Sequence, residues 1–274
     1  MKNNADALFF TRKECVEAPQ TLRIASVKSP SRISPRGLSA KRFDMEEQMK
    51  QLFIIATGNK GKIREIRDII IDPEAEVLSM REAGVEADPD ETGATFEENA
   101  LIKARAVSAL ICQKIEDGTF PIDTTDTQIT VMSDDSGLVI DALGGEPGIY
   151  SARYLGYDTD YNYKMEQIMK RMENVPEQER TARFVAAVAA IFPDGTEHVV
   201  RGAMEGVIAH SICGENGFGY DPFFYLPEYG KTSAEITEEQ KNEISHRGKA
   251  FRAMIALYNV WRAETDAAAD GTFL

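Results

Sequence analysis

The chain of 274 residues is long enough to bury a substantial hydrophobic core, as one large domain or two small ones. Its composition, 43% hydrophobic and 28% charged, is ordinary for a soluble globular protein. The net charge of −14 is unevenly distributed, because residues 1–50 hold ten Lys/Arg and six Asp/Glu and the remainder therefore carries −18. Nucleic-acid binding depends on cationic neutralisation of backbone phosphates, so this acidic body argues against a nucleic-acid partner.

The cysteines and the hydropathy of the chain indicate in which compartment the protein is expected. The three cysteines, Cys15, Cys112 and Cys213, form no C-x-x-C pair and favour neither a disulfide framework nor a structural zinc site. This usage indicates a reducing compartment, and we expect a cytoplasmic location. No apolar run approaches the roughly 20 residues of a membrane helix, so no membrane partner is expected.

Residues 1–50 are predicted to be a disordered N-terminal extension. Residues 21–42 carry six basic residues, five serines, two prolines and no acidic residue, a composition that does not support a packed core. A transit peptide is an alternative, which Asp6 and other acidic residues ahead of this segment weaken. A second alternative is that translation begins at Met45 or Met49, just before the first predicted strand.

From residue 52 onward the hydrophobic pattern predicts alternating strands and helices. An apolar strand at 52–57 precedes a helix with isoleucines at helical spacing, which Asp72-Pro73 ends. A T-x-x-E capping box at 95–98 begins a second helix that runs toward Cys112. We then expect a polar loop at 113–128 and two strands, at 129–133 and 138–142.

The second half of the chain predicts a long hairpin between two helices. The expected elements are a helix at 158–171, a strand at 183–192, a returning strand at 198–210 with a bulge at Gly206, and a closing helix with Phe251, Met254, Ile255, Tyr258 and Trp261 on one face. The predicted fold class is α/β: an elongated mixed sheet with a long central hairpin, flanking helices and two lobes around a cleft. We expect a catalytic domain at 51–263 and a C-terminal tail at 264–274.

The loop from Thr57 to Lys62 is a candidate phosphate site. Gly58 and Gly61 permit a tight turn that exposes backbone N–H groups, and the following helix N-terminus adds partial positive charge. Lys60 and Lys62 add full charges, although the spacing of the glycines is not that of a Walker A loop. An ordinary strand-to-helix turn with solvated lysines would have the same sequence.

Two acidic clusters are candidate metal or catalytic sites. Asp134 and Asp135 come at the end of a predicted strand, where neighbouring side chains point to opposite faces, so one carboxylate can face a site. The acidic cluster at 88–93 could join Asp135 in the two-carboxylate coordination that Mg²⁺ prefers beside phosphates. Lys103, on the second helix, could reach inward toward a phosphate. Solvated loops and a surface lysine are the alternative interpretation.

The final group of candidates could recognise a nucleobase. Phe218 lies on a glycine-rich loop and could stack on a purine face. Lys241, His246 and Arg247 supply three polar groups within seven residues, and lysine and arginine only donate hydrogen bonds. They therefore match carbonyl oxygens of a base, not amino groups. Taken singly, each has a structural interpretation as a turn, a surface lysine or a capping histidine.

The motifs occur in a fixed order, which is Thr57-Gly-Asn-Lys-Gly-Lys62, Glu91-Thr-Gly93, Thr95-Phe-Glu-Glu-Asn-Ala100 with Lys103, Asp134-Asp-Ser-Gly137, Gly144-Gly-Glu-Pro-Gly-Ile-Tyr-Ser-Ala-Arg-Tyr154, Phe218-Gly-Tyr-Asp221 and Ser245-His-Arg-Gly248. From about Leu52 to Arg262 this resembles the inosine/xanthosine triphosphate pyrophosphatase family, also called Ham1-like or RdgB-like. The resemblance implies an elongated α/β homodimer that hydrolyses ITP, dITP and XTP to the monophosphate and pyrophosphate with Mg²⁺, cleansing the nucleotide pool.

The resemblance also implies roles for individual residues. Contacts to the triphosphate are expected from Thr57, Gly58, Asn59, Lys60, Gly61, Lys62, Lys103 and Ser136. Glu91 and Asp135 would hold Mg²⁺, and Asp135 would also be the general base. The base would be framed by Phe218, Gly219, Tyr220 and Asp221, and its oxygen-bearing edge read by Lys241, His246 and Arg247. Two alternative functions are a Maf-type pyrophosphatase that acts on other modified nucleotides and a nucleotide sensor without catalytic activity.

Overall fold

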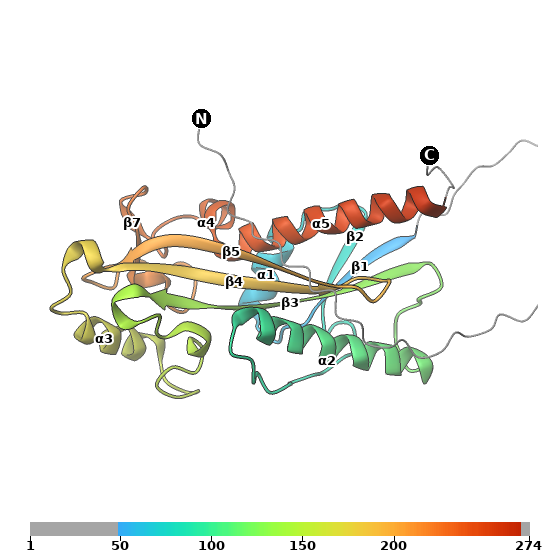
Figure 1. The fold of residues 1–274 in the computed structure, drawn as a ribbon, viewed down its shortest axis with the longest axis horizontal. Helices are drawn as coiled ribbons and strands as arrows, with labels where there is room; N and C mark the ends of the chain where they lie inside the picture. Colours follow the sequence, from blue (N-terminus) through green and yellow to red (C-terminus); the bar gives the residue numbers. More distant parts are fainter. Residues whose placement is uncertain (1–48, 270–274) are drawn as a thin grey trace, which may run out of the picture.

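The computed structural model describes residues 49–269, so residues 1–48 of the extension predicted at 1–50, and residues 270–274, lie outside the described part. A seven-stranded mixed sheet forms the centre of an elongated molecule (Figure 1). The strands are β1 (Lys50–Ile55), β2 (Ala75–Ser79), β3 (Thr127–Ile140), β4 (Thr181–Ile191), β5 (Glu197–Ile208), β6 (Phe224–Leu226) and β7 (Lys231–Thr232). The helices are α1 (Lys60–Ile69), α2 (Phe96–Glu116), α3 (Tyr161–Arg171), α4 (Glu238–Ile244) and α5 (His246–Ala269), with 3₁₀ turns at Asp141–Leu143, Gly148–Tyr150, Glu177–Glu179 and Asp221–Phe223.

The sheet order is β2-β1-β3-β4-β5-β6-β7, which confirms the predicted α/β class with a long central hairpin. Strand β1 runs parallel to both of its neighbours, β2 and β3. From β3 onward each pair is antiparallel, and β4 and β5 form the predicted hairpin. The sheet therefore changes from parallel to antiparallel at β3, and this strand carries the Asp134-Asp135 pair.

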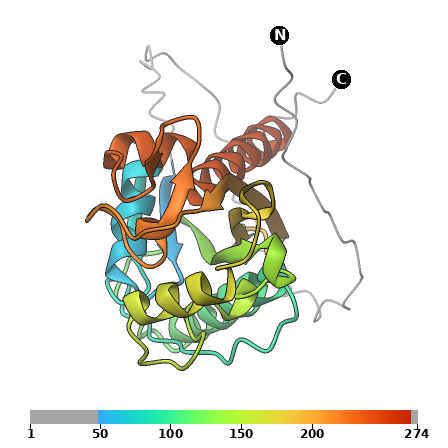
Figure 2. The same ribbon diagram turned by 90° about the vertical axis from the view of Figure 1, so that its left-hand side faces the viewer.

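Helices cover both faces of the sheet. Figures 1 and 2 show α4 and α5 on one side and α2 and α3 on the other. Alternation along the strands divides the core accordingly: Ala186 and Val188 of β4 pack with α1 and α5, whereas Ala187 and Ala189 pack against α2. The apolar stripe predicted for the closing helix is confirmed, since Phe251, Met254 and Tyr258 are buried and Ile255 and Trp261 are partly buried.

The two ends of the molecule have separate cores that share the long strands. One end is built from β1, β2, α1, α2 and α5. The other end buries residues of α3 and β6 against the far halves of β3, β4 and β5. Helix α5 continues to Ala269, beyond residue 263 where the domain boundary was expected. Among residues 49–269, none of the helices combines the length and hydropathy that spanning a membrane requires.

Three local predictions were wrong. The strands expected at 129–133 and 138–142 are one strand, because β4 pairs with β3 without interruption from Val131 to Ile140. Helix α2 extends to Glu116, so the predicted polar loop is shorter. Gly206 forms no bulge, since the β4–β5 register is continuous through it. A side chain there would meet the Phe224 ring at 2.6 Å, which is a packing reason for glycine.

Candidate active site

The end of β1 creates a cavity beside β3. Strand β1 stops at Ile55, which pairs with Met132, whereas β3 continues for eight residues past this point. The edge of β3 that carries Asp134 is therefore open. A cavity of about 840 Å³ lies there, lined by the 57–62 loop, Glu91 and Lys103 as well as Asp134. These are the segments that the sequence predicted to bind phosphate and metal, and the fold brings them together.

Asp134 and Asp135 point to opposite faces of β3, as the strand alternation predicted. Asp134 lies on the face covered by α1 and α5, where its Oδ2 is 3.0 Å from Lys62 Nζ and 3.3 Å from Arg247 Nε. Ser136 Oγ donates to the same oxygen at 3.2 Å. Burial acts to raise the pKa of Asp134, but the positive charges of Lys62 and Arg247 hold it far below its ordinary value.

Asp135 lies on the face covered by α2, close to Glu91. Lys103 Nζ donates to Glu91 Oε1 at 3.1 Å and to Asp135 Oδ1 at 3.3 Å. The other oxygens also have partners: Asn99 Nδ2 donates to Asp135 Oδ2 and Arg153 donates to Glu91 Oε2, both at 3.2 Å. Two carboxylates distant in sequence thus converge on one cation.

The charges on this face follow from burial and pairing. Burial raises the pKa of Asp135 above its ordinary value, against the lowering effect of Lys103. For Glu91 burial acts in the same direction, but Lys103 and Arg153 together lower its pKa. Although burial disfavours the charged form of Lys103, the surrounding carboxylates raise its pKa, so it is an ammonium ion.

Within residues 49–269 no three or more His, Cys, Asp or Glu side chains gather closely enough to enclose a metal ion. Glu91 and Asp135 form a two-carboxylate set instead. This set does not fit zinc, which takes three or four protein ligands. It fits Mg²⁺, which is usually held by one or two carboxylates and keeps water or phosphate oxygens as its other ligands.

The 57–62 loop is stabilised by its own side chains. Asn59 caps α1, and its Oδ1 accepts from Gly61 N at 2.8 Å and Lys62 N at 3.1 Å. Thr57 Oγ1 accepts from Asn59 N at 3.2 Å. Three of the N–H groups that the sequence analysis expected to be exposed, those of Asn59, Gly61 and Lys62, are therefore already bonded. Lysine side chains and the helix N-terminus remain as the attraction for an anion.

The residues predicted to recognise a base gather above Asp134. Phe218 covers the two cations, with its ring centroid 5.2 Å from Lys241 Nζ and 5.5 Å from Arg247 Cζ. The neighbouring cavity measures only about 20 Å³. Asp221 is buried and accepts from Lys241 Nζ at 2.6 Å and from Phe218 N at 2.8 Å. A base could reach the cations only if Phe218 moved.

Tyr220 and His246 are placed differently from the other candidates. Tyr220 is 3% exposed, and its hydroxyl donates to the Ser151 carbonyl at 3.0 Å. Its side chain therefore supports the loop from inside, whereas Gly219 beside it lies in the left-handed region. His246 stacks on Phe184, and burial keeps its pKa well below the ordinary value. Its ring is neutral, so one ring nitrogen can donate a hydrogen bond and the other can accept one.

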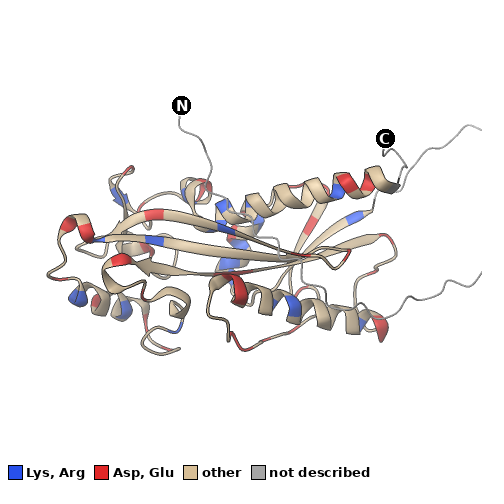
Figure 3. Ribbon diagram, in the orientation of Figure 1, with Lys and Arg blue, Asp and Glu red and all other residues tan. Residues whose placement is uncertain are grey.

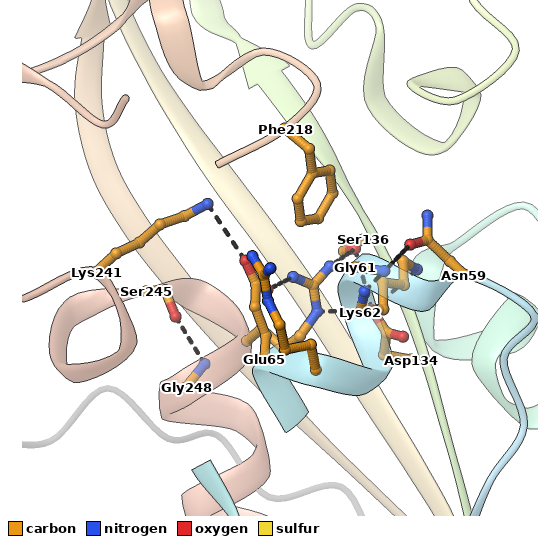
Figure 4. Close-up of polar contacts among 12 residues, drawn as sticks. Asn59, Gly61, Lys62, Glu65, Asp134, Ser136, Phe218, Lys241, Ser245 and Gly248 are labelled. Carbon is orange, nitrogen blue, oxygen red and sulfur yellow. Dashed lines mark hydrogen bonds and ion pairs between the residues drawn. The ribbon is translucent and has the colours of Figure 1, made fainter. Parts of the chain in front are cut away.

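Glu65 is part of this cluster although the sequence analysis did not select it. It lies on α1 and binds Arg247 Nη1, and its Oε1 is 3.4 Å from Lys241 Nζ (Figure 4). Its position three residues after Lys62 on the predicted helix places both on one helical face, which could have identified it. In Figure 3 the Lys and Arg positions of α1 and of the start of α5 lie close together near the middle of the ribbon, whereas Asp and Glu positions are spread along the length of the molecule.

Known proteins share this fold and these sequence features. Residues 53–257 match the Ham1 family. The chain is 42% identical to a dITP/XTP pyrophosphatase of Yersinia pseudotuberculosis, covering 75% of this chain and 96% of that protein, and 44% identical to one of Listeria monocytogenes, covering 73% and 91%. The solved Ham1 protein of Staphylococcus aureus superposes with a TM-score of 0.63 at 39% identity, over 76% of this chain and 98% of that one. The protein belongs to the Ham1 family.

Proposed function

We propose that this chain hydrolyses the deaminated purine nucleotides ITP, dITP and XTP to the monophosphate and pyrophosphate in a Mg²⁺-dependent reaction, and so cleanses the cytoplasmic nucleotide pool. The names of its relatives support this substrate class. The observation that carries the proposal is the cavity at the end of β1, which Glu91 and Lys103 line together with the lysines of the 57–62 loop, and where Lys103 joins Glu91 to Asp135. Phosphoryl transfer requires such positioning and charge neutralisation more than covalent chemistry.

In this proposal Glu91 and Asp135 hold the Mg²⁺. Bound there, the ion would neutralise the charge on the phosphate oxygens. Lys62 and Lys103 line the same cavity from opposite faces of β3 and would contact the triphosphate. Asp135 would accept a proton from the attacking water, and Asn99 orients its carboxylate through the bond to Oδ2.

Base selection in this proposal depends on the donors beneath Phe218. Lys241 and Arg247 present N–H groups, which suit the 6-oxo group of hypoxanthine and xanthine. Adenine carries an amino group at this position, so the donors would lose their partners. Buried polar groups that lose their partners can exclude a substrate strongly. Phe218 would then stack on the bound base after moving away from the two cations.

Pyrophosphate release tests the proposal. With Mg²⁺ we expect fast release from ITP, dITP and XTP, slow release from GTP, ATP and dTTP, and loss of release in Asp135→Asn. Asp117→Asn, an exposed position at the end of α2, is the matched control and should keep full activity. Preferential release from dTTP would favour a Maf-type enzyme. Binding of ITP without release by the wild type would favour a sensor.

We also infer a homodimer, which the family resemblance supports. Sedimentation velocity should give twice the mass of one chain, and a single-chain mass at micromolar concentration would contradict the inference.

A further inference from the structure

The ammonium of Lys103 occupies the point where two carboxylates converge. Its Nζ is bonded to Glu91 Oε1 and Asp135 Oδ1, and the Lys103 side chain is only 14% exposed. The second oxygen of each carboxylate is directed elsewhere, to Arg153 and to Asn99. The two oxygens best placed to hold a metal ion together are therefore the two that hold Lys103.

A divalent ion and the ammonium exclude each other from this position. Mg²⁺ binds oxygen at about 2.0–2.1 Å, so an ion that contacted both oxygens would lie in the volume that Nζ fills. If both stayed beside the two carboxylates, the metal ion and the ammonium would also repel each other strongly, because the site is partly buried. Entry of the metal ion therefore requires Lys103 to leave.

The Lys103 side chain can adopt another position without movement of α2. Its Cα belongs to α2, which packs firmly on the sheet through Ala100 and Ala104, but its four-carbon stem is flexible. The side chain lines the same cavity as the 57–62 loop. A change of side-chain rotamers can thus carry Nζ from the carboxylates into the cavity without movement of the helix.

On the basis of the proposed function, we propose that Lys103 is a placeholder for the divalent cation. In the free protein it neutralises Glu91 and Asp135 and keeps their carboxylates together. With metal and triphosphate bound, Glu91 and Asp135 would hold the ion and the ammonium of Lys103 would contact a phosphate. Metal alone then binds weakly, because it would leave the displaced ammonium without a partner. Metal and triphosphate together satisfy every charge, so each promotes binding of the other.

Binding of Mn²⁺ without nucleotide tests this exchange. Titration of the free ion by electron paramagnetic resonance should give a dissociation constant at least about tenfold lower for Lys103→Met than for the wild type. Lys62→Met is the matched control, because it removes one charge from the same cavity but from Asp134, not from the metal pair. Its gain should be clearly smaller. Adding Glu91→Gln to Lys103→Met should abolish the gain.

Chemical labelling of the wild type provides a second measurement that does not depend on folding of a variant. The reactivity of Lys103 toward acetic anhydride, followed by mass spectrometry, should rise as Mn²⁺ saturates the protein. Unchanged reactivity at saturation would overturn the proposal, as would equal gains in Lys103→Met and Lys62→Met, or a gain that persists with Glu91→Gln.

These measurements contain no nucleotide and therefore stand apart from the substrate assignment. If Mn²⁺ binding behaves as expected but ITP and XTP release no pyrophosphate, the proposed function fails and the placeholder role of Lys103 stands. If pyrophosphate release is fast but Lys103→Met does not bind Mn²⁺ more tightly than the wild type, the proposed function stands and the placeholder role of Lys103 fails.

Discussion

Replacement of Glu65 by glutamine should destabilise the protein far more than removal of a surface glutamate. The Glu65 carboxylate binds Arg247 Nη1 and lies 3.4 Å from Lys241 Nζ. The side chains of these two cations are only 2% and 8% exposed, so water cannot replace the lost partner. Glutamine keeps the shape of the side chain but leaves both positive charges with one fewer carboxylate. The remaining carboxylates, Asp134 and Asp221, are already shared.

The magnitude follows from the cost of breaking a buried ion pair. Removal of one partner from a fully buried pair costs about 3–5 kcal/mol, and the 14% exposure of Glu65 reduces this to about 2–4 kcal/mol. In a domain of this size such a loss lowers the melting temperature by roughly 5–10 °C. The matched control is Glu238→Gln on α4, whose pair with Arg64 is also short at 2.7 Å but more than half exposed. It should cost less than about 1 kcal/mol.

Urea denaturation followed by circular dichroism gives both free energies. The same two variants tested on ITP should also differ, since Glu65 sets the positions of Lys241 and Arg247. If Glu65→Gln and Glu238→Gln lose equal stability, or if the first loses less than about 0.5 kcal/mol, the cations are not held by Glu65 and the reasoning from burial is wrong.

Two further changes probe the α1 and α5 ends of the site. Hydrogen bonds from Arg67 and from Ser79 lower the pKa of Glu82 from 4.5 to about 2. Its carboxylate therefore stabilises the fold fully above pH 4.5 and loses this effect as the pH falls toward 2. The difference in free energy of unfolding between the wild type and Glu82→Gln should shrink over that range and stay constant above it. A difference that is the same at all pH values would contradict this. In Gly202→Ala the new Cβ would lie 2.3 Å from the His246 carbonyl oxygen, so we expect about 1–3 kcal/mol of destabilisation and a lower kcat/KM for ITP. Unchanged urea denaturation and unchanged kinetics would show that α5 adjusts without cost.

Much of the fold could be predicted because its signals are local. The Thr95 cap of α2, the apolar stripe of α5 and the turn at 193–195 each depend on residues close together in sequence, and all appear in the structure. The predicted capping box is only half formed, because the Glu98 carboxylate accepts from Ala94 N and not from Thr95 N. The division of β3 into two strands failed for a physical reason. Polar residues at 133–136 are typical of a loop, yet they remain in the strand because β4 supplies their backbone partners. Nothing in the local sequence specifies that pairing.

The sequence predicted which residues belong to the candidate site better than it predicted which of them bind each other. Motif order brought Asp134, Asp135, Lys103 and Glu91 into one group, but not which cation each carboxylate binds. Lys62, which is predicted to contact a phosphate, pairs with Asp134 in the free protein, and the sequence did not indicate this pair. Such pairings depend on side-chain reach across the sheet, which the spacing of residues along the chain does not specify.

The small residues of β4 explain how helices on both faces can reach a single strand. Ala187 lies opposite Asp135 in the register, and on its face it packs with Ala100 and Ala104 of α2. Because these side chains are small, α2 approaches the sheet closely enough for Lys103 to bind Asp135. A larger residue at 187 would push the helix outward and separate the ammonium from its carboxylates. Residues 186–190 of β4, all alanine or valine, are therefore a determinant of the site geometry although none of them is polar.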